Sequence, residues 1–395
     1  MEAVWPGQRL DTSRRRTKAS VATGYTRFQD GDVLVPKITP TFEAGRAVLI
    51  NGLHRGVGAG STELHVIRPG ALIDPRFLLY VVNTHSFLKK GEAEMYGVAG
   101  QRRVPDTFLR DLPVDLPTLE EQRRIADFLD AEVSRIDGLI DVQNRLRGRL
   151  FERRATGVMS AVADTERKDR RPSTLAWLET IPVDWQEVRV GLLARMGSGH
   201  TPSRSRPEWW TDCRIPWITT GEVKQVRDDR REDLLGTREK ISELGLANSA
   251  AELHPAGTVV LCRTASAGYS AVMGTVMATS QDFVTWTCGP RLDPYYLLWC
   301  LRAMRADLLG RLAMGSTHKT IYVPDLQMLR IPLPSLDEQR KIVKRIREQN
   351  AKIDRLSDTV VRQSSLLAER RRALITAAVT GQIDVSTASG RGIEE

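Results

Sequence analysis

Apolar residues recur at alternating steps of four and three along one stretch of the chain, and the same spacing returns near the C-terminal end. Six of the eight stripe positions are apolar in each stretch: Ile125, Leu129, Ile136, Leu139, Leu146 and Leu150, then Ile342, Ile346, Ile353, Leu356, Val360 and Leu367. This heptad spacing predicts two long helices with a coiled-coil seam. The alternative is two helices that each pack only on their own domain, but that arrangement would leave both stripes exposed.

The two stretches are copies of one another. Residues 116–162 begin LPTLEEQRRI and residues 333–379 begin LPSLDEQRKI, and they align without a gap at a constant separation of 217 positions, as Glu121 and Glu338 do. A match kept over such a length indicates an internal duplication. The chain is therefore predicted to hold two modules, each a globular segment followed by a long helix.

Shorter patterns place mixed elements ahead of each helix. In the first module, residues 33–38, 47–50 and 62–67 are typical of strands, and residues 74–83 are typical of a helix with an acidic start. Residues 257–264 and 293–301 match the first strand and the helix. Residues 224–243 are highly charged and are predicted to form a surface loop with a short helix.

The two modules differ in length before their matching parts. Gly31 is preceded by 30 residues, whereas 76 residues separate Ile181 from Gly257. Roughly 46 residues at the start of the second domain thus lack a counterpart in the first. The expected fold class is α+β, with two mixed α/β domains separated and joined by two long helices that form an antiparallel coiled coil in a pseudo-two-fold repeat.

Composition narrows the function only modestly. Lys and Arg outnumber Asp and Glu by 58 to 49, which gives a net charge of +9 and favours a polyanionic partner such as nucleic acid, although many proteins carry as much charge. The four cysteines form no CxxC pair, so we expect reduced core thiols and no metal site. The sequence has no secretory signal and no apolar run long enough to span a membrane.

Catalytic patterns are weak. Asp293-Pro294-Tyr295-Tyr296 resembles the motif with which amino-methyltransferases hold a flipped base, but Asp74-Pro75 occupies the equivalent place in the first module, which favours a shared helix start. Asp184 with Glu222 and Lys224 superficially fits a nuclease pattern without any counterpart in the first module. No Walker sequence or nucleophile elbow occurs. We therefore expect no catalytic residues.

Polar and basic loops are the binding candidates, because Arg, Lys, Gln, Ser and Thr contact phosphates and base edges. The candidate DNA-binding residues are Lys37, Thr39, Gln101, Arg102 and Arg103 in the first module, and Thr201, Ser203, Arg204, Arg206, Arg263, Thr264, Ser266, Tyr269, Thr317, His318 and Lys319 in the second. Any one of them could equally be an ordinary exposed loop residue. The recurrence of such loops in both modules supports binding.

At the start of each long helix the sequence Leu-Pro-x-Leu-x-Glu-Gln-Arg resembles the conserved regions of the specificity subunit of type I restriction–modification systems. Residues 262–274, with residues 35–42 as their counterpart, and the loops GSGHTP, IPWITTGEV and GSTHKT are also similar to that family. The resemblance covers about residues 25–385 and rests chiefly on the paired Glu-Gln-Arg helices.

The resemblance implies two target recognition domains that each read half of a split double-stranded DNA site, with the coiled coil as a spacer. It implies docking of two modification subunits and of restriction subunits, which would carry S-adenosylmethionine, ATP and Mg²⁺, while this chain binds no cofactor and works in the cytoplasm. The family normally begins its first domain with a segment like IPVDWQEVRVGLL, so the first domain is expected to be N-terminally truncated. A degenerate copy that acts as a scaffold is the alternative, and a solitary methyltransferase or nuclease is a third.

The expected division of the chain is a disordered basic start (1–20), a first recognition domain (21–115), a first long helix (116–162), a linker (163–180), a second recognition domain (181–332), a second long helix (333–380) and a disordered tail (381–395).

Overall fold

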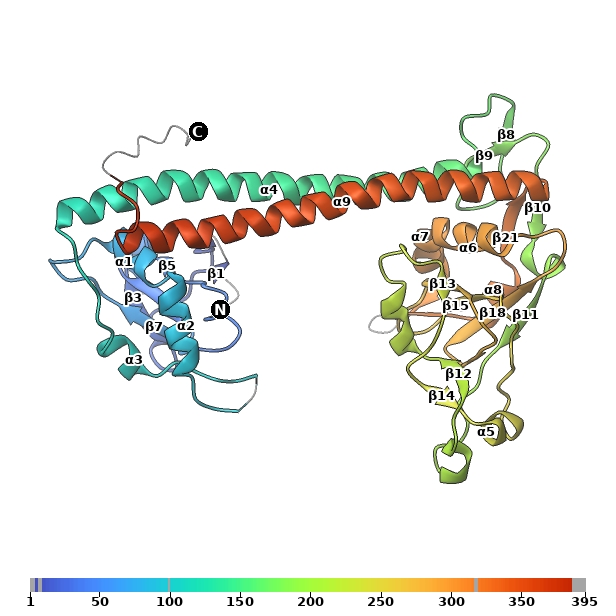
Figure 1. Cartoon of the computed structure of the whole chain (residues 1–395), viewed down its shortest axis with the longest axis horizontal. Coiled ribbons are helices and arrows are strands. Elements are labelled where there is room, and N and C mark those ends of the chain that lie inside the picture. Colours follow the sequence, from blue (N-terminus) through green and yellow to red (C-terminus); the bar gives the residue numbers. More distant parts are fainter. Residues whose placement is uncertain (1–3, 6–8, 99, 316–318, 386–395) are drawn as a thin grey trace. The chain divides into compact units, whose positions relative to one another are not determined.

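The computed structural model describes residues 4–5, 9–98, 100–315 and 319–385. The chain divides into two compact units (Figure 1): a first unit of Met1–Arg147 with Thr359–Glu395, and a second unit of Gly148–Asp358. Two long helices, α4 (Leu119–Ala163) and α9 (Leu336–Val379), contribute to both. The predicted start at 1–20 and tail at 381–395 lie partly outside the described residues.

The first unit holds a small mixed domain. Its strands are β1 (Val4–Trp5), β2 (Arg9–Leu10), β3 (Thr26–Gln29), β4 (Val33–Pro36), β5 (Val48–Leu49), β6 (Val57–Gly60) and β7 (Leu64–Ile67), and its shorter helices are η1 (Ala19–Val21), η2 (His54–Gly56), α1 (Pro75–Val81), α2 (His85–Ala93) and α3 (Asp106–Arg110). The buried strand β4 lies between β5 and β7. Its side chains pack with α1 and α2 in a core that includes Phe42, Leu79 and Phe87.

The second unit is larger. Its strands are β8 (Arg170–Pro172), β9 (Thr180–Pro182), β10 (Gln186–Arg189), β11 (Ala194–Ser198), β12 (Ile215–Ile218), β13 (Asp233–Leu234), β14 (Lys240–Ile241), β15 (Val259–Cys262), β16 (Ser270–Met273), β17 (Ala278–Thr279), β18 (Phe283–Cys288), β19 (Ala313–Met314), β20 (Thr320–Ile321) and β21 (Arg330–Leu333). Its shorter helices are η3 (Val190–Leu192), η4 (Pro207–Trp210), η5 (Thr220–Gln225), α5 (Glu243–Ala247), α6 (Pro294–Ala303), α7 (Arg305–Asp307), η6 (Leu308–Leu312) and α8 (Val323–Gln327). The central sheet has the order β11-β18-β15-β16-β13.

The two sheets share a three-stranded centre. Val33 of β4 pairs with Leu49 and Ile67, and Val259 of β15 pairs in the same way with Val272 and Trp286. The flanking strand β11 of the second unit comes from the segment that the first module lacks, whereas the other flanking strand, β13, follows that segment. Within the described residues, the first unit's sheet therefore corresponds to the centre of the second unit's sheet without those two edges.

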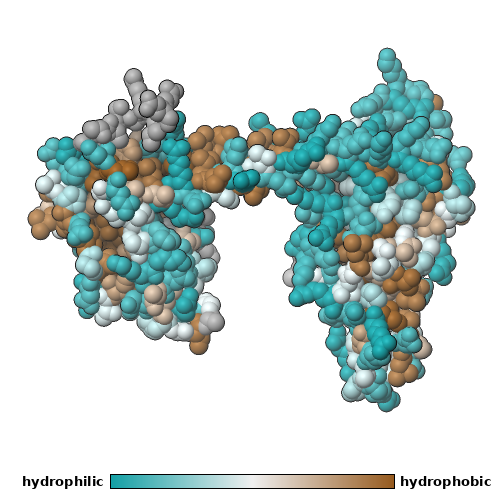
Figure 2. Space-filling view, viewed as in Figure 1, coloured by the Kyte–Doolittle hydropathy of each residue, from teal (hydrophilic) through white to brown (hydrophobic). Residues whose placement is uncertain are grey.

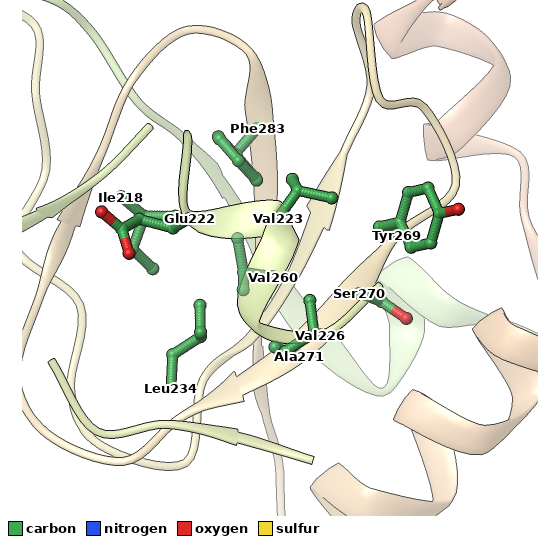
Figure 3. A pocket seen from close by; sticks show the side chains of 10 residues that line it. All are labelled: Ile218, Glu222, Val223, Val226, Leu234, Val260, Tyr269, Ser270, Ala271 and Phe283. Carbon is green, nitrogen blue, oxygen red and sulfur yellow. The ribbon is translucent and has the colours of Figure 1, made fainter. Parts of the chain in front are cut away.

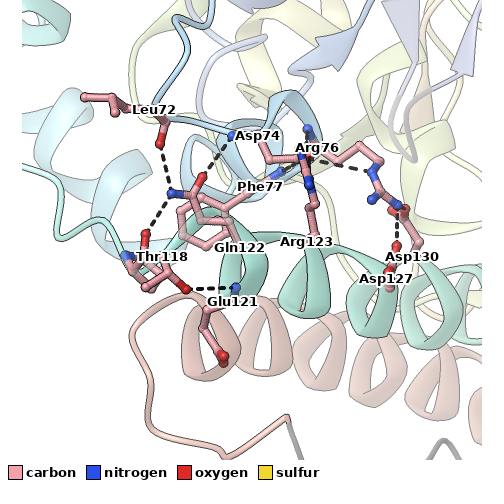
Figure 4. Close-up of polar contacts among 11 residues, drawn as sticks. Leu72, Asp74, Arg76, Phe77, Thr118, Glu121, Gln122, Arg123, Asp127 and Asp130 are labelled. Atoms are coloured by element: carbon pink, nitrogen blue, oxygen red, sulfur yellow. Dashed lines mark hydrogen bonds and ion pairs between the residues drawn. The ribbon is translucent and has the colours of Figure 1, made fainter.

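A buried glutamine fixes the start of each long helix to its own domain. In the first unit (Figure 4), the Gln122 amide donates to the carbonyls of Leu72 (3.0 Å) and Pro117 (2.9 Å), and its oxygen accepts the Asp74 N–H (2.8 Å). Gln122 is fully buried. A buried amide with all these partners satisfied holds the chain in one geometry.

Gln339 repeats this contact in the second unit. Its amide donates to the carbonyls of Arg291 (3.0 Å) and Pro334 (3.1 Å), and its oxygen accepts the Asp293 N–H (2.8 Å). The carboxylates of Asp74 and Asp293 then cap α1 and α6 by accepting backbone N–H groups of the first turn. Asp293-Pro294 is thus a helix start common to both units, as the repeat predicts, and not a base-holding motif of a methyltransferase.

Contacts within each unit pair the long helices in antiparallel directions. In the first unit Gln143 donates to Gln363 (3.0 Å) and Arg371 pairs with Asp137 (3.0 Å). In the second unit Arg154 pairs with Asp354, and Arg345 donates to the Ala161 carbonyl (3.2 Å). In both units a higher residue number on α4 meets a lower one on α9, which confirms the predicted antiparallel helix pair.

The predicted seam is wrong at three positions. Leu139 (46 % exposed), Leu146 (42 %) and Leu356 (56 %) lie on the surface, whereas Ile125, Leu129, Ile136, Leu150, Ile342, Ile346 and Val360 are buried and Ile353 and Leu367 are half-buried. A straight α-helix drifts by about 20° per heptad against a repeat of 3.5 residues. In helices this long, a stripe with strict four-three spacing therefore drifts away from the line along which the two helices contact each other, and its middle positions become exposed.

The charged segment 224–243 is more than a surface loop. It supplies β13 to the central sheet, and Asp229 accepts two hydrogen bonds of 2.7 Å from Arg305. The backbone carbonyl of Asp229 also accepts the guanidinium groups of Arg154 (2.8 Å) and Arg302 (2.9 Å). This segment therefore joins α4 and α6 within the second unit, because its acidic and carbonyl oxygens satisfy buried arginines.

Candidate nucleic-acid interface

Three predicted residues of the second unit gather around one turn. The Thr201 hydroxyl donates to the Gln281 side chain (2.6 Å), Arg263 Nε donates to the Gln281 carbonyl (2.9 Å), and the Thr264 hydroxyl donates to Asp282. The turn follows β17 and lies between the loops after β11 and β15. The result is a polar cluster held by hydrogen bonds between separate loops.

Gln281 and Asp282 were missed by the sequence reasoning. They directly follow Ser280 in a short polar run between two buried strands. This polar run is the sequence feature that could have pointed to them. Gln281 is exposed, and its amide is of the type that reads adenine edges. It therefore joins the candidate residues, while Asp282 orients Thr264.

Two exposed arginines lie on the loop that follows the β11 strand. Arg204 and Arg206 have side chains 69 % and 64 % exposed, and their ion pairs with Glu239 (3.7 Å) and Glu208 (3.8 Å) are long. The Arg204 guanidinium lies over the Trp210 ring, 4.9 Å from its centroid. Exposed ion pairs of this length contribute little stability, so both guanidinium groups can exchange these partners for phosphates.

The remaining predicted residues of the second unit are less favourably placed. The Ser203 hydroxyl forms a hydrogen bond with the Ser205 hydroxyl (2.8 Å), and Ser266 lies half-buried in the turn after β15. The Lys319 ammonium donates to the carbonyl of Leu309 (2.9 Å). Thr317 and His318 lie outside the described residues.

Tyr269 belongs to a packed interior region. It is one of the side chains that line an apolar cavity of about 10 Å³ (Figure 3), which has room for little more than one water molecule. The Arg305 guanidinium lies 4.6 Å from its ring centroid. These contacts pack the Tyr269 side chain against the second unit's core.

The candidate cations of the first unit are paired with carboxylates of the same unit. The pairs are Lys37 with Asp106 (3.4 Å), Arg102 with Glu43 (3.7 Å) and Arg103 with Glu63 (2.8 Å). Hydrogen bonds from Arg103 hold the pKa of the Glu63 carboxyl below its usual value. Binding a phosphate here would first require these pairs to open.

The backbone brings the first unit's other candidates together. The Thr39 hydroxyl donates to the Arg102 carbonyl (3.0 Å) and accepts the Arg102 N–H (2.9 Å). Gln101 is exposed next to this contact. Residues 101–104 therefore lie beside the segment that follows β4.

The same backbone contact recurs in the second unit. The Val104 N–H donates to the Lys37 carbonyl (2.9 Å), and the Ile321 N–H donates to the Arg263 carbonyl (2.8 Å). Val104 and Ile321 are separated by the same 217 positions as the long helices. In both units a basic residue thus follows the central strand and meets a second polar loop.

The structure separates the carboxylates of the nuclease-like pattern that the sequence contains. Asp184 pairs with Arg167 (2.9 Å), whereas Glu222 is buried and accepts the Arg238 N–H (2.9 Å), so the two carboxylates of the nuclease pattern are held separately. The described residues contain no group of three or more His, Cys, Asp or Glu side chains that could hold a metal ion. Burial raises the pKa of the Cys262 and Cys288 thiols to about 12, so both thiols are protonated at neutral pH and are poor nucleophiles.

Large apolar side chains are exposed on the long helices (Figure 2). In the first unit they are Leu139, Val142, Leu146, Val361 and Leu366, and in the second unit they are Phe151 and Leu356. Clustered exposed apolar residues on a helix pair are typical of interaction surfaces. Among the described helices, none is long and apolar enough to cross a membrane.

Two mixed α/β units, each fixed to a pair of long antiparallel helices, define the class of protein. The model of the type I restriction modification DNA specificity domain matches residues 25–144 and 182–356, and the chain belongs to this family.

Individual relatives agree with this assignment. The specificity subunit of the Escherichia coli type I restriction enzyme EcoAI is 47 % identical over 106 residues, which are 27 % of this chain and 18 % of that protein. The match thus spans less than a fifth of the relative's length.

Solved structures support the fold. A chain described under "Structural basis underlying complex assembly and conformational transition of the type I R-M system" has a TM-score of 0.70 at 19 % identity and covers 91 % of this chain and 85 % of that one. The HsdS subunit from Thermoanaerobacter tengcongensis has a TM-score of 0.50 at 20 % identity and covers 90 % of this chain and 82 % of its own.

Proposed function

We propose that this chain is the DNA-reading subunit of a type I restriction–modification complex, in which it binds a bipartite double-stranded site and carries no reaction of its own. One observation supports this most strongly: in both units a basic residue at the end of the central strand, Lys37 or Arg263, meets a second polar loop. Two such surfaces joined by paired helices suit a site with two separated halves.

The candidate DNA-binding surfaces of the two units differ in how tightly their arginines are paired with carboxylates. Arg204 and Arg206 of the second unit are exposed with loose ion pairs, whereas Arg103 of the first unit is held in a close pair with Glu63. We infer that the second unit contributes more of the binding free energy. In the alternative, a degenerate copy, the first unit would contribute nothing to the DNA-binding free energy and would serve only as a scaffold.

The exposed apolar residues of the helices in the first unit are proposed as a docking surface for a modification subunit. S-adenosylmethionine, and ATP with Mg²⁺, would be held by the modification and restriction subunits and not by this chain. Because its proposed partner is cellular DNA, we propose that the complex works in the cytoplasm.

The DNA-reading role is tested by replacing exposed arginines. Arg204→Ala with Arg206→Ala should weaken DNA binding by the reconstituted complex about tenfold and should reduce the slope of log K against log salt by about one for each phosphate that the variant no longer binds. Arg340→Ala, on a 62 % exposed helical side chain, is the matched control and should leave the DNA affinity unchanged. Equal binding by the double variant and the wild type would contradict the proposal.

The docking role has a separate readout. Val142→Lys with Leu146→Lys should prevent co-purification with the modification subunit, because charged side chains would enter an apolar interface. Thermal unfolding of the isolated chain should hardly change, since both residues are exposed.

The purified chain with S-adenosylmethionine alone should not methylate DNA, and methylation by it would exclude the non-catalytic assignment.

A further inference from the structure

An edge strand of the second unit is covered by the segment that begins its domain. Strand β21 pairs antiparallel with β10, and the Val190 N–H continues the ladder by donating to the Leu329 carbonyl (2.9 Å). The apolar side chains of β21 lie in the unit's core, where Ile331 is fully buried and Leu333 is 8 % exposed. Trp185 and Val190, on either side of β10, are buried in the same core.

The segment of the first unit that corresponds to β21 has no paired strand among the described residues. Residues 113–116 lie 217 positions before 330–333 and lead into α4 as β21 leads into α9. Val114, the counterpart of Ile331, is 37 % exposed, and Leu116, the counterpart of Leu333, is 45 % exposed. Figure 2 shows hydrophobic surface on this unit near the start of α4.

The sequence correspondence assigns to residues 112–116 the alternating hydrogen-bonding positions of β21. In an antiparallel pair every second residue exchanges hydrogen bonds with its partner. The Val190–Leu329 contact sets those positions at Leu329, Ile331 and Leu333, which correspond to Leu112, Val114 and Leu116. Pro113 lies between the first two of these positions and Pro117 follows the last, so neither proline occupies a position where a missing N–H costs a ladder hydrogen bond.

We propose that residues 112–116 form a docking edge for an extended segment of another polypeptide chain, which adds a strand there as β10 does in the second unit. The second unit supplies the chemistry of the occupant: an aromatic residue, then valines three and five positions later, as in Trp185, Val188 and Val190. A second copy of this chain is disfavoured, because its own matching strand is already paired with β21. The proposal does not depend on DNA reading.

A synthetic peptide of residues 184–193 (DWQEVRVGLL) is the probe. Titrated as a fluorescent conjugate into the full chain, it should bind and should slow hydrogen exchange at the Val114 and Leu116 amides. Exchange at Ile331 and Leu333 should stay unchanged. A peptide N-methylated at Val188 should bind at least about tenfold more weakly, whereas methylation at Glu187, whose N–H faces away from the edge, should have little effect.

Chain variants complete the test. Val114→Lys with Leu116→Lys should keep the fold, because both side chains are exposed, and should weaken peptide binding at least about tenfold. Leu244→Lys, a 50 % exposed position in the second unit, should bind like the wild type. The proposal is overturned if the peptide does not bind at about 1 mM, if the double variant binds it equally well, or if protection appears only at Ile331 and Leu333 through strand exchange. Self-association of the chain that the peptide dissolves would assign the edge to a second copy and would also overturn it.

Discussion

The two units differ least where they attach to the long helices and most at the edges of their sheets. Gln122 and Gln339 make the same three hydrogen bonds, each within about 0.2 Å of its counterpart. The sheets share only the strands around β4 and β15. The difference indicates that the helix attachment is constrained by geometry, whereas the surface that each domain presents is free to diverge.

The same contrast occurs inside the shared strands. Asp32 and Arg68 face each other beside Val33 and Ile67 in the first unit, with a hydrogen bond of 2.8 Å. The equivalent positions in the second unit are Thr258 and Thr287, whose hydroxyl oxygens are 3.1 Å apart. A charged cross-strand pair in one unit is thus a neutral pair in the other, at one position of one sheet.

The largest effect is expected from removing the buried glutamine that fixes the start of each long helix to its domain. Gln122→Ala and Gln339→Ala each leave one buried N–H and two carbonyls without their partner, which should lower the free energy of unfolding by about 4 kcal/mol in either unit. Denaturant titration with hydrogen exchange for each unit measures this. A tolerated change in one unit beside a severe one in the other would show that the two attachments are not equivalent.

A change confined to the second unit comes next. Asp229→Ala removes the carboxylate that pairs with Arg305 and faces Arg302, whose pKa burial lowers to about 10. We expect a loss of about 3 kcal/mol, because a buried guanidinium would lose its counter-charge. Hydrogen exchange should rise in α6 and β13, and the first unit's domain should be unaffected. Unchanged protection of α6 would count against this role.

The charged pair of the first unit should make its stability depend on pH. Hydrogen bonds from Arg68 lower the pKa of the buried Asp32 carboxyl. Its stabilisation is therefore complete above the unfolded pKa of about 4 and is lost as the pH falls through the lower folded pKa. Asp32→Asn should cost about 2 kcal/mol at pH 7 and progressively less below about pH 4. Thr258→Val, the matched change in the second unit, should show no such pH dependence in urea titrations.

The smallest effect tests the corrected helix contact. Leu146→Lys should change the free energy of unfolding by less than about 0.5 kcal/mol, because the side chain is exposed. Leu129→Lys, at a fully buried position of the same stripe, should destabilise the first unit by several kcal/mol. Similar losses from both substitutions would restore Leu146 to the seam.

The sequence predicted much of this arrangement because duplication and heptad spacing are visible along the chain. The strands, the two helix starts and the antiparallel pairing were all accessible from it. It could not place Gln122 in a buried pocket, because the carbonyls of Leu72 and Pro117 reach the amide only in three dimensions. It also missed Asp229, since a charged run resembles a solvated loop until its arginine partners on α4 and α6 are known.

The candidate site was accessible only in part. Thr201, Arg263 and Thr264 meet around Gln281, which lies in a run too short and ordinary to stand out in the sequence. Tyr269 follows a strand in the sequence as the other candidates do, but the direction of its side chain depends on packing with Arg305. Residue type along a loop therefore indicates what can bind DNA, whereas the fold decides which residues are available.

Methylome sequencing of cells that express this chain with the modification subunit of its own system tests the central claim most directly. We predict methylated adenines within one motif that has two defined halves separated by a fixed number of unspecified base pairs. In Arg263→Ala cells, only the half read by the second unit should lose definition. A motif with a single defined half, or methylation without any fixed spacer, would contradict the account of two DNA-reading units.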